Sequence, residues 1–354
     1  MERIQSNGSI TVQSVQYEGP DAVRVRLSPE PSDAKQWHHE PGAFITFSIT
    51  PSLQRSYTLL NPVGSLPLEI LVRSISGGKG SRFFNQEARV GRVMQARTPK
   101  SLLWQPEWNH ESQHFVCFAG GIGITPIFSL IQHVMLHPEL GHRISLIYSN
   151  RTRKHALCAD ALYAWRDRIN FIPIYSEEEV FESPGQFGHV TIQRIKQWLK
   201  AFGDNEKTRY IISAPPALMR TIHAGLNEEQ IPQNRRHTER FTSSALSDAL
   251  PDLPSHPTTD RPDCTITLER DHGMEQFQMR GEGQSILDAA LSAGLSVPNS
   301  CRGGVCMSCL AHVTQGEVQT EGDSGLSEQE QRDGLILCCR SQPQSNALGL
   351  RFIH

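Results

Sequence analysis

The sequence has no apolar run close to the ~20 residues that a helix needs to cross a bilayer. Its first ten residues, MERIQSNGSI, are polar and lack the apolar segment of a secretory signal. The formal net charge is only −3, so the chain shows no basic footprint for nucleic acid. These absences argue against a membrane-spanning, secreted or nucleic-acid-binding protein and predict a cytoplasmic globular one.

Lysine is missing from the last part of the chain, because none follows Lys207. From Asp263 to the end there are 12 acidic and 6 basic residues, whereas the preceding residues hold 25 acidic and 28 basic ones. The C-terminal part is therefore acidic and the front mildly basic. This imbalance indicates either an ordinary solvated surface or a face that steers a partner by its charge.

The length of 354 residues suggests two or three domains. Short alternating, β-rich segments fill residues 1–107 and predict an antiparallel β-barrel. Residues 108–241 alternate compact apolar strands with helical stretches, which predicts a parallel, helix-covered α/β sheet. A stretch rich in Pro, Ser, Thr and Asp at 242–262 predicts a semi-rigid linker. Residues 263–354 then form a small mixed module.

Five of the 8 cysteines lie between positions 301 and 339. Cys301, Cys306 and Cys309 have the C-x4-C-x2-C spacing, and further cysteines follow about thirty residues later. This is the arrangement of a plant-type [2Fe–2S] cluster, in which four thiolates hold two irons. A structural zinc site is the alternative, but such sites favour two C-x2-C pairs and only one is present. The sequence therefore predicts a [2Fe–2S] cluster.

The fourth cluster ligand is either Cys338 or Cys339. Adjacent residues on a strand point to opposite faces, so only one of them can bind iron. Cys339 is followed by Arg-Ser-Gln-Pro, a C-x-x-x-P continuation that favours it as the ligand. The remaining cysteines, at 117, 158 and 264, lie in or beside apolar runs and are interpreted as buried, inert thiols.

A glycine-rich segment follows one of the predicted strands and opens a helix. Glycines there let the backbone approach a pyrophosphate, whose charge is met by the helix N-terminus. The proline in the segment suits a first helical turn. The candidate nucleotide-binding residues are Gly120, Gly121, Gly123, Thr125 and Pro126.

The next predicted strand ends in a basic loop with Ser149, Arg151 and Arg153. In nucleotide-binding folds this place reads the adenosine ribose. An acidic residue suits a free 2′-hydroxyl, whereas arginine suits a 2′-phosphate. The nearest following acidic residue is Asp160. The pattern favours NADPH over NADH, with a solvated basic loop as the alternative.

Arg55-Ser56-Tyr57-Thr58 matches the R-x-Y-[ST] flavin motif. With the nucleotide and cysteine motifs, in this order, the chain resembles the ferredoxin–NADP reductase-like flavoprotein reductases with a C-terminal plant-type ferredoxin domain. The resemblance implies that Arg55 binds the flavin phosphate, Tyr57 packs on the flavin ring and Thr58 approaches flavin N5 as the catalytic residue. A second flavin motif, G-x-x-S, is matched by a segment that contains Gly78, Gly80 and Ser81.

Two further segments carry the resemblance. Ser213-Ala-Pro215-Pro resembles the C-G-P segment at the nicotinamide, with Ser-Ala in place of Cys-Gly. Glu239-Arg-Phe241 resembles the E-x-F close of the nucleotide domain. The resemblance implies that Ser213, Pro215, Glu239 and Phe241 border the cofactors.

The family implies three domains: an antiparallel β-barrel for flavin, an α/β doubly wound nucleotide domain and a β-grasp ferredoxin domain. It implies FAD, with FMN as the alternative, and electron transfer from NAD(P)H through flavin and cluster to a partner protein. That partner is a terminal oxygenase of Rieske or epoxidase type, or alternatively a hybrid-cluster protein. A non-catalytic redox sensor is the rival function from another class.

Overall fold

The computed structural model describes most of the chain. The described residues are 7–50, 53–101, 103–178, 186–239, 263–270, 273–279, 284–295, 297–299, 304, 308–320, 326 and 328–353. The predicted linker at 242–262, Phe241, Cys301 and Cys306 lie outside them. By contacts the chain divides into two units, Met1–Ile45 with Tyr57–Phe241 and Thr46–Ser56 with Thr242–His354.

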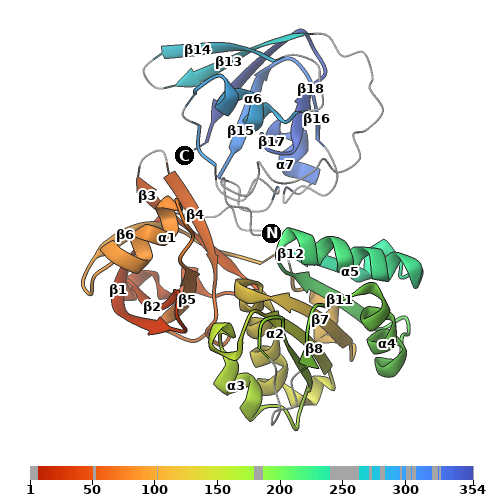
Figure 1. The fold of residues 1–354 in the computed structure, drawn as a ribbon. Coiled ribbons are helices and arrows are strands. Elements are labelled where there is room, and N and C mark those ends of the chain that lie inside the picture. The colour runs from red at the N-terminus through yellow and green to blue at the C-terminus, as the bar shows by residue number, and fades with distance from the viewer. Residues whose placement is uncertain are drawn as a thin grey trace. The chain divides into compact units, whose positions relative to one another are not determined.

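The first six strands form one antiparallel sheet with the order β4-β3-β6-β1-β2-β5. An antiparallel bridge between Leu59 and Ile70 joins the end of β4 to β5, so the two edges of the sheet meet. The predicted antiparallel barrel is therefore present. Its elements are β1 (Asn7–Glu18), β2 (Ala22–Pro29), β3 (Phe44–Thr50), β4 (Leu53–Thr58), β5 (Leu68–Arg73) and β6 (Val93–Lys100), with a short helix α1 (Lys79–Arg82) (Figure 1).

The second sheet is parallel, in the order β10-β9-β8-β7-β11-β12. Alternate side chains of its central strand β7 enter two separate cores: Phe115 and Cys117 pack under α2 and α3, and Val116 and Phe118 pack under α4 and α5. This is the doubly wound arrangement that the sequence predicts. The elements are β7 (His114–Gly120), α2 (Ile124–Leu136), β8 (Arg143–Asn150), α3 (Ala159–Ala164), β9 (Asn170–Tyr175), β10 (Gln186–Phe187), α4 (Ile192–Phe202), β11 (Thr208–Ser213), α5 (Pro216–Glu228) and β12 (Arg236–Glu239).

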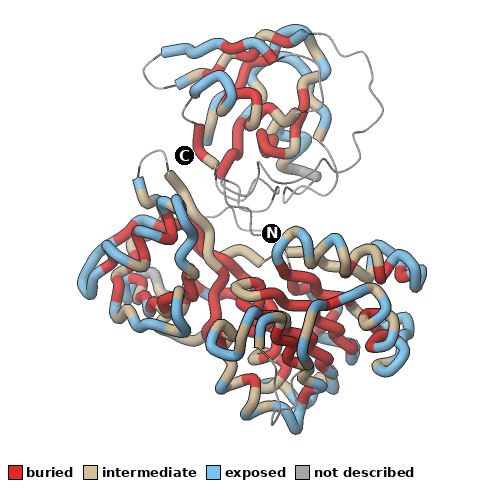
Figure 2. The backbone as a smooth tube through the Cα atoms, in the orientation of Figure 1, coloured by how far each residue is buried: buried red, intermediate tan, exposed pale blue. Residues whose placement is uncertain are grey.

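The barrel and the parallel sheet share a hydrophobic core. Ala22, Leu60 and Leu71 from the barrel belong to the same buried cluster as Phe115 and Leu130 from the nucleotide domain. Figure 2 shows the central strands β7, β8 and β11 of the parallel sheet as mostly buried. The relative orientation of these two parts is thus held by close packing, which tolerates little displacement.

The C-terminal module is built on a mixed five-stranded sheet, β14-β13-β19-β15-β17. Ile266 and Leu268 of β13 alternate inward and meet Ile286 and Leu287 of helix α6. The predicted helix start is confirmed, because Ser285 Oγ accepts a hydrogen bond from the Asp288 amide at 3.1 Å. The elements are β13 (Cys264–Arg270), β14 (Gly273–Met279), α6 (Ile286–Ser292), β15 (Leu310–Gln315), β16 (Val318–Thr320), α7 (Glu328–Arg332), β17 (Leu335–Leu337), β18 (Ser341–Pro343) and β19 (Ala347–Phe352).

Among the residues that the structure describes, no helix combines the length and the apolar character that crossing a membrane requires.

Candidate functional site

The first flavin motif occupies strand β4 of the barrel. Ser56 Oγ and Thr46 Oγ1 of neighbouring strand β3 share a hydrogen bond of 2.7 Å. Arg55 Nη1 donates to the Gln54 carbonyl at 2.7 Å. Thr58, the predicted catalytic residue, is buried, with 6% of its surface exposed. The strand therefore fixes the backbone of all four motif residues.

The second flavin motif is a compact turn into α1. Ser81 Oγ accepts from the Ile75 amide at 3.1 Å and donates to the Gly78 carbonyl at 3.1 Å. A Cβ on Gly78 would lie 2.6 Å from Ser81 Oγ, so the turn needs glycine there. Gly80, in the first turn of α1, is buried. In this structure the Ser81 hydroxyl holds the turn itself together.

The two flavin motifs meet through aromatic rings. The turn after α1 continues as a π-helical segment, Phe83–Glu87. The Phe84 ring in it lies edge-on to the Tyr57 ring, with centroids 5.0 Å apart. Tyr57 is thereby oriented by the segment that directly follows the second motif. Both motifs lie on one part of the barrel, as a shared ligand would require.

The glycine-rich segment lies between β7 and α2, at the carboxyl edge of the parallel sheet. Gly123 packs so closely on the Ser213 carbonyl that a Cβ would overlap it. A Cβ on Gly120 would lie 2.5 Å from Pro215 Cδ. Gly121 has φ +54°, and its carbonyl accepts a hydrogen bond from the Tyr148 hydroxyl at 3.0 Å. Steric contacts at Gly120 and Gly123 and the positive φ at Gly121 therefore favour glycine at all three positions. The same contacts fix the segment against its neighbours.

Helix α2 begins directly after these glycines. Thr125 and Pro126 lie in its first turn and are buried, and Thr125 Oγ1 donates to the Ile122 carbonyl at 3.1 Å. The open crevice beyond the carboxyl ends of the strands is where such sheets bind nucleotides. The residues predicted for the pyrophosphate thus lie at the carboxyl edge of the sheet and in the first turn of α2.

Ser213 ends strand β11 beside this segment and is fully buried. Its hydroxyl has no hydrogen-bond partner among the described residues. Buried polar groups are normally hydrogen-bonded, so an orphaned hydroxyl at a ligand-binding edge fits a polar group of a bound cofactor. Pro215, two residues further on, directly precedes helix α5. The Ser-Ala segment therefore keeps a polar group where the family pattern has cysteine.

Glu239 ends strand β12 and pairs in register with Ser213. Burial raises the pKa of its carboxyl from the ordinary 4.5 to about 7. A carboxyl with such a pKa changes its protonation state close to neutral pH. It therefore adds a titrating group at the edge where Ser213 and the glycines meet.

The basic loop after β8 has a carboxylate beside it that the sequence of the loop itself does not contain. Ser149 is the penultimate residue of β8. The Arg153 guanidinium lies over the Tyr163 ring, 5.1 Å from its centroid, and the Arg153 amide donates to Glu178 Oε2 at 2.6 Å. The fold thus brings a distant carboxylate to a loop that lacks one. The sequence held one signal for this contact: Glu178 follows strand β9, and the residues after two adjacent parallel strands lie at the same edge of the sheet.

Two described residues of the first cysteine motif, Gly304 and Cys309, lie close to the segment with the second cysteine pair. Gly304 has φ +81°, and a Cβ there would lie 2.6 Å from Arg340 Cγ. The Cys338 amide donates to the Cys309 carbonyl at 3.1 Å. Two segments that both carry predicted ligands therefore touch through their backbones. This proximity fits four thiolates around one cluster.

Cys338 and Cys339 lie in a turn after β17, whereas the sequence predicts a strand there. Cys338 is fully buried in the hydrophobic core, and burial raises the pKa of its thiol. Cys339 keeps 9% of its surface exposed. Both cysteines belong to the same hydrophobic core, and they differ only in that Cys339 is slightly more exposed.

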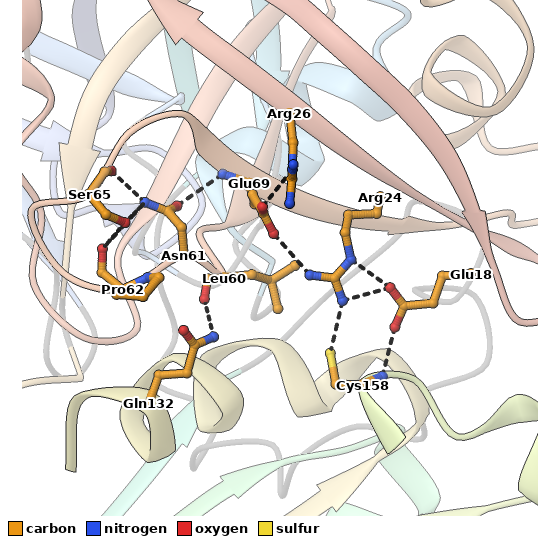
Figure 3. Close-up of polar contacts among 10 residues, drawn as sticks. All are labelled: Glu18, Arg24, Arg26, Leu60, Asn61, Pro62, Ser65, Glu69, Gln132 and Cys158. Carbon is orange, nitrogen blue, oxygen red and sulfur yellow. Dashed lines mark hydrogen bonds and ion pairs between the residues drawn. The ribbon is translucent and has the colours of Figure 1, made fainter. Parts of the chain in front are cut away.

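A network of charges crosses the seam between barrel and nucleotide domain (Figure 3). Arg24 lies between Glu18 and Glu69, with N–O distances of 2.7 and 3.0 Å. The second carboxylate oxygen of Glu18 accepts from the Cys158 amide at 2.7 Å. Burial raises the pKa of the Cys158 thiol to about 12, as expected for an inert thiol. The network adds directional contacts to the shared core.

Two domain families match the chain. The oxidoreductase NAD-binding domain family matches residues 117–224. The 2Fe-2S iron-sulfur cluster binding domain family matches residues 270–344. The predicted nicotinamide nucleotide and [2Fe–2S] cluster are confirmed at the level of these domains.

Similar proteins extend over nearly the whole chain. One subunit of the 1,2-phenylacetyl-CoA epoxidase from Escherichia coli (strain K12) is 26% identical over 355 residues, 97% of either chain. The ferredoxin reductase component of 3-ketosteroid-9-alpha-monooxygenase from Rhodococcus rhodochrous is 25% identical, covering 97% of this chain and 96% of that one. The structure of phthalate dioxygenase reductase has the same fold, with a TM-score of 0.60, 22% identity and 97% coverage of both chains.

Proposed function

Because this chain belongs to the ferredoxin–NADP reductase-like flavoprotein reductases that end in a plant-type [2Fe–2S] domain, we propose that it is the reductase component of an oxygenase system. The observation that carries this function is the combination of both domain families with full-length similarity to oxygenase reductases. Its substrates are NAD(P)H and a terminal oxygenase of Rieske or epoxidase type. A cytoplasmic location, where thiol ligands stay reduced, suits such a reductase.

We assign residues 1–107 to flavin binding, 108–241 to the nucleotide, 242–262 to a linker and 263–354 to the cluster. The flavin is FAD. When bound, nicotinamide supplies a hydride, flavin accepts two electrons and releases them singly, and the cluster carries one electron at a time. One NAD(P)H thus yields NAD(P)⁺, a proton and two electrons for the acceptor.

The chain's own residues bind and orient these groups. Arg55 and the turn at Gly78–Ser81 hold the flavin phosphates, and Tyr57, oriented by Phe84, packs on the ring. Thr58 would be the catalytic residue next to the reacting flavin atom when the flavin is bound. The orphaned Ser213 hydroxyl receives the nicotinamide carboxamide. Cys301, Cys306, Cys309 and Cys339 bind the irons.

The packed seam contributes to function through geometry. Hydride transfer needs reacting atoms about 3–3.5 Å apart, so the two binding parts must keep their orientation. The core shared by Leu60, Leu71 and Phe115 and the Glu18–Cys158 contact provide that rigidity.

The test is an anaerobic titration of the purified holoprotein with NADPH and, separately, NADH, followed by visible absorbance. Bleaching of flavin and cluster bands together is expected. A C306S variant should keep nucleotide-dependent flavin bleaching but lose reduction of cytochrome c as a one-electron protein acceptor. If wild-type protein bleached with neither nucleotide, a redox-sensing binding protein would be the better account.

A further inference from the structure

The basic loop after β8 packs against the turn between barrel strands β1 and β2. A Cβ on Gly19 in this turn would lie 3.0 Å from the Lys154 carbonyl. The Arg73 guanidinium of β5 donates to the His155 carbonyl at 2.8 Å. One side of the loop that is expected to bind the adenosine ribose therefore packs against the barrel. Residues of that turn are distant in sequence but close to the loop.

Asp21 is the acidic residue of this turn and is firmly held. Its Oδ1 accepts from Arg73 Nε at 3.1 Å, and its carbonyl accepts from the Ser74 amide at 2.6 Å. Its Oδ2 lies 3.9 Å from Arg151 Nη2. The carboxylate thus stands between two guanidinium groups. One of them, Arg151, belongs to the loop that favours a 2′-phosphate.

The Arg73 side chain also contacts the glycine-rich segment. A Cβ on Gly121 would lie 2.6 Å from Arg73 Nη1. The Asp21–Arg73 pair therefore extends from the nucleotide's predicted pyrophosphate segment to its predicted ribose loop. This places a barrel carboxylate beside the part of the nucleotide in which NADH and NADPH differ.

Carboxylates and arginines at this place have opposite effects on the two nucleotides. A carboxylate suits a free ribose 2′-hydroxyl, and an arginine suits a 2′-phosphate. Asp21 partly neutralises Arg151 and would repel a phosphate dianion that approaches it. Glu178, bound to the Arg153 amide, adds a second negative charge to the loop. The local balance is less basic than the loop sequence alone suggests.

We propose that Asp21 is a specificity-determining residue that engages Arg151 and weakens recognition of the 2′-phosphate, shifting the preference of the reductase toward NADH. This inference rests on the proposed function for its nucleotide substrate. Arg151 is the residue through which Asp21 acts, and Arg73 fixes the carboxylate in place.

The test compares wild type with D21N in two independent measurements. The first is kcat/KM for NADPH and for NADH. The second is calorimetric binding of 2′,5′-ADP and of 5′-AMP, which carry and lack the 2′-phosphate and need no electron transfer. D21N should raise kcat/KM for NADPH and affinity for 2′,5′-ADP about fivefold, the effect of an exposed ion pair of about 1 kcal/mol. NADH and 5′-AMP should change less than about twofold.

Three further variants separate specificity from folding. D167N removes a charge of the same kind from a side chain that is 91% exposed and should leave all four values unchanged. D21E keeps the charge and should behave like wild type. In an R151Q background, D21N should lose most of its effect, because its partner is absent.

The outcomes distinguish this inference from the proposed function. If D21N lowered the values for all four ligands in parallel, Asp21 would only brace the loop, and the inference would be wrong. The inference would also be wrong if D21N left unchanged both the ratio of kcat/KM for NADPH to that for NADH and the ratio of the affinities for 2′,5′-ADP and 5′-AMP. If the wild-type protein oxidised neither nucleotide but D21N still bound 2′,5′-ADP more tightly, the proposed function would fail while the specificity role stood.

Discussion

The rings of Tyr57 and Phe84 meet edge-on, with their planes at 80° and their centroids 5.0 Å apart. One ring belongs to strand β4 and the other to the π-helical segment after α1. Phe84 is fully buried, whereas Tyr57 is partly exposed. Phe84 is therefore the buried ring of the pair, and Tyr57 is the ring with a solvent-accessible part.

Replacing Phe84 with leucine should lower flavin content more than stability. The variant removes the edge-to-face contact, worth about 0.5–1.5 kcal/mol, but keeps most of the apolar volume. The measurement is the flavin-to-protein absorbance ratio after purification, together with the urea midpoint. The matched control is F128L, which changes a buried phenylalanine stacked on Trp165 in the nucleotide domain. Equal flavin loss in both variants would contradict a specific role for Phe84.

The adjacent cysteines should respond differently to serine. C339S should lose the visible cluster absorbance and most of its iron. C338S should keep the cluster but place a hydroxyl in the hydrophobic core, at a cost of about 1–3 kcal/mol in unfolding free energy. Iron analysis and denaturant unfolding of both proteins provide the check. Cluster loss in C338S with retention in C339S would reverse the ligand assignment.

Acid should destabilise the protein through partly buried histidines around the connector between barrel and nucleotide domain. His133 packs on Trp104 at 4.6 Å and His237 on Trp108 at 5.1 Å, and burial lowers the pKa of both histidines to about 4. Their folded pKa lies below the ordinary 6.5, so the unfolded state binds protons more tightly. Stability is therefore lost as pH falls from about 6.5 toward about 4.

The variant that tests this loss is H133F, which removes one titrating ring and keeps an aromatic one. Between pH 7 and 5 its unfolding free energy should fall less than that of wild type, by on the order of 1 kcal/mol. H110F, at an exposed histidine, serves as the control and should follow wild type. An unchanged slope in H133F would show that this histidine does not report acid destabilisation.

Glu239 should make the unfolding free energy depend on pH in the opposite direction. Its folded pKa of about 7 lies above the ordinary 4.5, so its contribution to stability is present at low pH and declines as pH rises through 7. E239Q should match wild type at pH 5 and exceed its unfolding free energy at pH 8 by on the order of 1–3 kcal/mol. Urea unfolding at both values measures this. An E239Q protein with the same stability as wild type at pH 8 would show that the carboxylate is well solvated and that its pKa is not raised.

Local signals predicted the elements of the fold well. Alternation marked the barrel strands, and the Ser285 cap and the helix that opens at Ile124 began where short-range chemistry indicates. These features depend on residues a few positions apart. Spacing likewise sufficed to predict the two domain families, whereas the cluster ligands and the nucleotide contacts stay predictions.

Contacts between distant segments were not predicted. Asp21 meets Arg151 across 130 positions because a barrel turn packs on the nucleotide domain, and no local pattern encodes that meeting. The sequence at Cys338 indicates a strand instead of a turn because the apolar run Leu335–Leu337 continues into it. The support of Tyr57 by Phe84 was also missed, since it requires two separate motifs to be folded together.

The hydrophobic core common to barrel and nucleotide domain has a consequence for exchange between related proteins. Leu60 and Leu71 are buried against residues such as Phe115 and Ile127 of the neighbouring domain. A chimaera that replaced only one half would confront side chains that were never matched to each other. We therefore expect the barrel and the nucleotide domain, residues 7–239, to be exchanged together between related proteins, although they have different folds.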